Sequence, residues 1–244
     1  MCPAFIDPGI EENFKKWIVI YPQPIALSLA RLLSSRTPQD TVDHCFKSAE
    51  VSARYIAACA LASFAARTNA GSDGESVQQL AGNISFGTFE QIINQISRKN
   101  VEHPLKSALS VYSNPHPNIS GSGPRQSPSQ WFGRIVELRD DLGHSLSAIS
   151  EPRARTILQD EHLPELLHGI LKSFEHLLSY PLFVIDEQRI EHGEINAQIL
   201  WLMGESKDPI PEGIQLSRDI RSIRHPYIAI DQRILNLCPS LIWD

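Results

Sequence analysis

The residues whose types and spacing could do chemistry lie in one short stretch, RDDLGH at positions 139–144. In a helix, Asp140 and His144 would stand four positions apart and could meet on one face. A carboxylate beside an imidazole orients the ring and favours its protonated form. Arg139 is five positions from His144, about 140° around a helix, so the two would flank that face. Gly143 is typical of a helix end, from which His144 would project.

These residue types suit cleavage of RNA through the ribose 2′-OH, without a metal. His144 could act as the base that takes the 2′ proton, and Arg139 could hold the charge that develops on the phosphate. One arginine and one histidine make a sparse site, which two copies of the chain facing each other in a symmetric dimer would complete. The alternative is that the same polar residues simply solvate the exposed end of an amphipathic helix.

Three arginines, Arg218, Arg221 and Arg224, form a second group at three-residue spacing. On a helix this spacing makes a basic stripe that could bind the phosphates of a substrate. The alternative is a solvated surface whose charge is balanced by Asp219 and nearby acids.

Other motifs are incomplete. Neither glycine-rich segment has Walker spacing, and HGE at 192–194 lacks the Pro-Cys-x-x-Cys that a zinc deaminase needs. The histidines form no H-E-x-x-H or Cys/His cluster. The sequence therefore predicts no metal and no cofactor.

Composition narrows the class of protein. The chain has 244 residues, of which 42% are hydrophobic and 20% charged, with a formal net charge of −6. This acidic balance argues against a broad basic surface for coating nucleic acid, but it leaves room for a local basic site. The sequence has no apolar run long enough for a membrane span and no apolar signal region at its start. Four cysteines without paired spacing predict reduced thiols and a cytoplasmic protein.

Apolar periodicity predicts a helical body of four to six helices. It is strongest from Val42 to Phe64, and further helices are expected after Pro24, after Thr88 as N-cap, and at 163–180. The segment at 131–142 carries apolar residues every three or four positions, so RDDLGH would end an amphipathic helix. Loops are predicted at 68–76 and 114–130 from their glycine, proline and serine.

After Pro181 the pattern changes to short apolar runs. Two runs around EHGE predict a β-hairpin, and 227–237 predicts a second strand pair with its turn near Asp231. We therefore expect a helical domain at 1–180 and a small antiparallel β appendage at 181–244. The apolar end of the sequence, CPSLIWD, suggests a module excised from a longer protein.

RIVELRDDLGHS, placed on a late helix of a helical domain, resembles the HEPN family. The family signature is Arg, a polar residue, a few more residues and then His, and RDDLGH matches its R-x4-H form. The resemblance implies a dimeric helical bundle and a composite, metal-independent endoribonuclease of defence or stress-response systems. Arg139 and His144 would then be catalytic, and Asp140 would position or tune them.

The sequence also departs from the family pattern. Asp140 stands where Asn is commoner, Gly143 where a small apolar residue is typical, and no Tyr follows two positions after His144. The β appendage is additional to the family's bundle and could bind a partner protein or lead to a downstream domain. Two alternatives therefore remain: a catalytically inactive HEPN-like interaction or sensor module, and an unrelated helical interaction domain.

Overall fold

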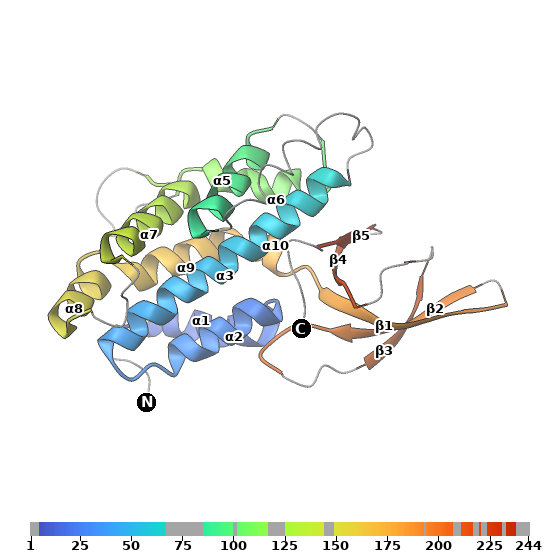
Figure 1. Ribbon diagram of the computed structural model, residues 1–244, viewed down its shortest axis with the longest axis horizontal. Coiled ribbons are helices and arrows are strands. Elements are labelled where there is room, and N and C mark those ends of the chain that lie inside the picture. Colours follow the sequence, from blue (N-terminus) through green and yellow to red (C-terminus); the bar gives the residue numbers. More distant parts are fainter. Residues whose placement is uncertain are drawn as a thin grey trace.

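The protein is mainly helical, with a five-stranded antiparallel sheet at its C-terminal end (Figure 1). The structure is a computed structural model that describes residues 5–66, 85–99, 102–116, 125–143, 149–192, 194–206, 211–216, 220, 224–230 and 233–237. The whole of the loop predicted at 68–76 lies outside these residues, and so does 117–124 of the loop predicted at 114–130.

The described residues contain nine α-helices, so the prediction of four to six is wrong. They are α1 (Pro8–Ile20), α2 (Gln23–Leu33), α3 (Pro38–Ala65), α5 (Phe86–Ser97), α6 (Lys106–Ser110), α7 (Pro128–Leu142), α8 (Glu151–Gln159), α9 (Leu163–Ser173) and α10 (Glu175–Leu178). The excess has two causes. The segment predicted as one helix at 163–180 is interrupted at Phe174, whose ψ of 11° is not helical. Helices α1 and α8 were not predicted from the sequence.

Helix α3 is the centre of the helical part and runs through it from end to end (Figure 1). Its N-cap is Thr37, whose hydroxyl accepts a hydrogen bond from the Asp40 N–H at 3.1 Å, and Pro38 occupies the first turn. Many of its buried residues are alanine and serine, which allow close approach of the helices that pack against it: α2, α5, α7, α8 and α9. The strong helical prediction for this segment is confirmed.

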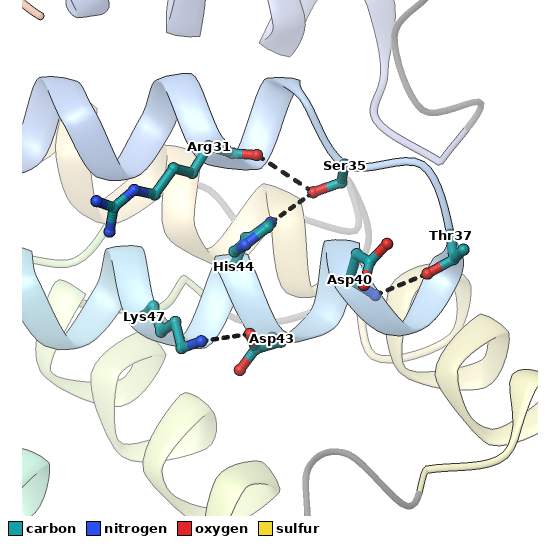
Figure 2. A network of polar contacts seen from close by, with 7 residues as sticks. All are labelled: Arg31, Ser35, Thr37, Asp40, Asp43, His44 and Lys47. Carbon is teal, nitrogen blue, oxygen red and sulfur yellow. Dashed lines mark hydrogen bonds and ion pairs between the residues drawn. The ribbon is translucent and has the colours of Figure 1, made fainter.

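The turn from α2 into α3 is fixed by side chains as well as by backbone (Figure 2). The Ser35 hydroxyl lies 2.8 Å from Nδ1 of His44 on α3 and 3.4 Å from the carbonyl oxygen of Arg31 on α2. Ser35 is buried, so its hydroxyl needs these partners. The contacts hold the end of α2 against the second turn of α3.

The N-cap of helix α5 lies three residues before the predicted one. The N-cap is Ser85, and Thr88 occupies the third helical position, where it closes a capping box with Ser85. The predicted N-cap at Thr88 is therefore wrong. Both residues carry hydroxyls, and the sequence pattern could not decide which one starts the helix.

The sheet has the strand order β3-β2-β1-β4-β5. Its strands are β1 (Leu182–Glu191), β2 (Glu194–Trp201), β3 (Pro211–Leu216), β4 (Pro226–Ile230) and β5 (Arg233–Asn236). The two predicted hairpins, β1–β2 and β4–β5, are confirmed. Strand β3 was not predicted, since its sequence PEGIQL combines proline, glycine and charge in the manner of a loop.

The two faces of the sheet have different environments. One face shares the main core with the helices through Leu182, Val184 and Ile228. The other face has a small core of its own, built from Phe183, Ile185, Ala197, Ile199, Leu216 and Tyr227. The connection after β2 fastens the sheet to the helical part, because Leu202 accepts a hydrogen bond from the Gln23 N–H and Gly204 donates one to the Tyr21 carbonyl, both at 2.8 Å.

Candidate functional site

Arg139 and Asp140 lie on the last turn of α7, which ends at Leu142. The helix begins with a capping box between Ser127 and Gln130, and its apolar side buries Trp131, Phe132, Ile135 and Leu138. Burial of this side fixes the rotation of the helix and therefore the directions of the polar residues at its end.

Gly143 is the C-cap of the helix, with φ 63° and ψ −166°, and its N–H donates to the Asp140 carbonyl at 3.0 Å. This backbone region is almost exclusive to glycine. The prediction that Gly143 marks the helix end is confirmed. His144 lies outside the described residues. The prediction that it shares a helix face with Asp140 assumed helical spacing up to His144, but the helix ends at Leu142.

Arg139 is held by residues of two other helices. Its Nη1 lies 3.0 Å from Oε2 of Glu50 on α3, and its guanidinium carbon lies 5.8 Å from the centre of the Phe86 ring at the start of α5. The side chains of Arg139 and Glu50 are 33% and 35% exposed, so solvent still reaches both. The guanidinium therefore sits at the seam between α3, α5 and α7.

Asp140 follows Arg139 by one position, about 100° further around α7, and is exposed. Asp141 is exposed as well. The described part of the candidate site therefore consists of one anchored cation and two solvated carboxylates at a helix end.

The basic stripe predicted from Arg218, Arg221 and Arg224 is described only at Arg224. That residue is exposed and lies in a turn before β4, with φ 63°, and its N–H donates to the Ile185 carbonyl at 2.8 Å. The helical spacing behind the predicted stripe therefore does not hold at Arg224. Arg218 and Arg221 lie outside the described residues.

A cavity of about 630 Å³ lies on another side of α7, against the connection between α8 and α9. Arg134 lines it and pairs with Glu137 at 3.2 Å and with Glu161 at 2.5 Å. Its hydrogen bond to Glu161 raises the pKa of the Arg134 guanidinium. Arg134 and Arg139 are five positions apart, about 140° around the helix, and Arg139 is not among the cavity's lining residues.

Two serine–histidine pairs were not found from the sequence, because the members of each pair lie on different segments that only the fold brings together. They are Ser35 with His44, and Ser63 with Nδ1 of His103 at 2.8 Å. Ser35 is 3% exposed and Ser63 is fully buried. Neither hydroxyl is accessible to a substrate in this structure, so we interpret both pairs as structural contacts between segments.

The thiols of Cys45 and Cys59 are buried and free on α3. Burial raises the pKa of both thiols, that of Cys59 to about 12, so both stay protonated near neutral pH and are weak nucleophiles. Among the described residues, no group of three or more His, Cys, Asp or Glu side chains could hold a metal ion. In the same part of the chain, no helix is both long and apolar enough to cross a membrane.

The chain was compared with protein-family models, curated proteins and solved structures. No protein-family model, no curated protein and no solved structure matches this chain.

Proposed function

We propose that the chain is a metal-independent endoribonuclease of HEPN type, acting as a homodimer in a defence or stress-response system. The observation that carries the proposal is the position of Arg139 and Asp140. They lie on a solvent-accessible helix end directly before the Gly143 turn that leads to His144. A cation, a carboxylate and an imidazole are thereby confined to six consecutive residues at one end of α7.

In the proposed reaction, neutral His144 takes the proton of the ribose 2′-OH, and the 2′ oxygen attacks the adjacent phosphorus. The bond from phosphorus to the 5′ oxygen breaks, which leaves a 2′,3′-cyclic phosphate. Arg139 stabilises the negative charge that develops on the non-bridging oxygens. The motif of a second copy supplies the imidazolium that protonates the departing 5′ oxygen, and Asp140 orients the ring.

The test is cleavage of a mixed pool of tRNA and single-stranded RNA in EDTA. We expect the wild-type chain to leave 2′,3′-cyclic phosphate ends, and His144→Ala and Arg139→Ala each to lower the rate by about 100-fold or more. Arg134→Ala is the matched control, because it removes an arginine of the same helix that also pairs with a glutamate. Cleavage that survives in His144→Ala would mean that the assignment is wrong.

A second candidate function is a catalytically inactive interaction or sensor module. The ion pair of Arg139 with Glu50 and its contact with Phe86 favour this candidate, because both are what a purely structural arginine would make. It predicts no cleavage by the wild type under any of these conditions. It also predicts that Arg139→Ala changes thermal stability or self-association, measured by calorimetry and sedimentation velocity.

A further inference from the structure

We propose that Glu50 is the positioning residue of the Arg139 guanidinium, an inference that rests on the proposed ribonuclease function. Glu50 lies on α3, far from RDDLGH in the sequence, and no motif includes it. In the folded chain its carboxylate is 3.0 Å from Nη1 of Arg139.

The contacts of Arg139 restrict two kinds of motion. The carboxylate of Glu50 fixes the end of the guanidinium, and the ring of Phe86, which is 2% exposed, limits its swing toward α5. A guanidinium has five N–H donors in a planar fork, and one of its nitrogens, Nη1, lies 3.0 Å from the Glu50 carboxylate. Because a third of the Arg139 side chain remains exposed, the guanidinium can still donate to a phosphate that approaches from solvent.

Stabilising the fold is a poor explanation for this ion pair. Ion pairs between partly exposed side chains add little to stability, since solvent screens the charges and ordering two long side chains costs entropy. The same ordering favours catalysis, because an arginine that is already oriented need not lose that freedom in the transition state. Glu50 therefore acts on the reaction through Arg139 without touching RNA.

The experiment is steady-state cleavage of a single-stranded RNA in EDTA by five chains: wild type, Arg139→Ala, Glu50→Ala, Glu50→Gln and Glu161→Ala. We expect Glu50→Ala to lower kcat about tenfold and to change KM less than about twofold, because orientation matters in the transition state. Glu50→Gln keeps the length of the side chain and a polar oxygen that can lie against Nη1, so its kcat should stay within about threefold of the wild type. Glu161→Ala removes one of the two glutamates that pair with Arg134, an arginine of the same helix as Arg139, and should leave kcat unchanged.

The possible outcomes separate this inference from the proposed function. If the wild type does not cut, the proposed function fails and the role of Glu50 fails with it. If Arg139→Ala abolishes cleavage but Glu50→Ala cuts normally, only the role of Glu50 is wrong. If both Glu50 variants cut faster, Glu50 competes with phosphate for Arg139, and positioning is overturned. Thermal unfolding of each variant shows whether a lost rate reflects a lost fold.

Discussion

Neighbouring polar residues at the end of α7 have different environments, and the difference limits what each one can do. Arg139 is tied to Glu50 and Phe86, whereas Asp140 is exposed one position later. A substitution of Arg139 removes contacts between helices as well as a charge, so its effect on activity must be read beside its effect on stability. A substitution of Asp140 removes no contact of this kind among the described residues.

The turn at Gly143 gives a prediction about stability. Gly143→Ala should lower the free energy of unfolding by about 1–3 kcal/mol, the cost of a side chain in this backbone region. Gly133→Ala is the matched control, because Gly133 lies inside the same helix and an added Cβ would meet no atom within 4 Å. It should raise stability by up to about 1 kcal/mol. Urea unfolding of both variants measures the difference, and equal midpoints would contradict the prediction.

His168 gives a prediction about pH. Its Nε2 lies 3.0 Å from the Asn13 amide nitrogen, and its ring stacks on Trp17 at 5.2 Å. Burial lowers the pKa of His168, nearby Lys172 adds to this effect, and Asp7 opposes it. Because the unfolded chain then binds the proton at higher pH than the folded chain, the free energy of unfolding should fall as pH drops from 6.5 through the folded pKa.

The measurement is urea unfolding of the wild type and of His168→Gln between pH 7.5 and 5. Glutamine does not titrate, so His168→Gln should lose stability less steeply than the wild type as the pH falls. His176→Gln, at an exposed histidine on α10, is the control and should follow the wild type. A His168→Gln curve as steep as that of the wild type would assign the pH dependence to other groups.

At the scale of elements, the sequence predicted what strong local patterns encode. The α3 helix and both hairpins follow from apolar period and turn residues. The break at Phe174 between α9 and α10 did not follow, because Phe174 and the leucines after it continue the buried pattern across it. The pairing of Arg139 with Glu50 could not follow either, since it depends on how α7 packs against α3. Local patterns specify elements, whereas tertiary packing decides which side chains meet.

At the scale of the whole molecule, the sheet is joined to the helices through more than shared apolar side chains. Gly204, just after β2, donates its N–H to the Tyr21 carbonyl at the end of α1. A Cβ at this position would lie 2.8 Å from the Val19 carbonyl oxygen, and Gly204 has φ 72°. Only glycine therefore lets the backbone of this connection approach the end of α1 so closely.

Gly204→Ala should therefore weaken the attachment of the sheet to the helical part. We expect the free energy of unfolding to fall by more than about 2 kcal/mol, because backbone strain alone costs about 1–3 kcal/mol and the contact with Val19 adds to it. Gly213→Ala, in β3 where an added Cβ meets no atom within 4 Å, should change stability far less.

Limited proteolysis distinguishes detachment of the sheet from unfolding of the whole chain. Early cutting at 202–206 that leaves an intact helical fragment would mean that the sheet separates first. If Gly204→Ala resists protease as the wild type does, this backbone contact is not needed to hold the two parts together, and the Gln23–Leu202 hydrogen bond and the shared core at Leu182, Val184 and Ile228 are sufficient.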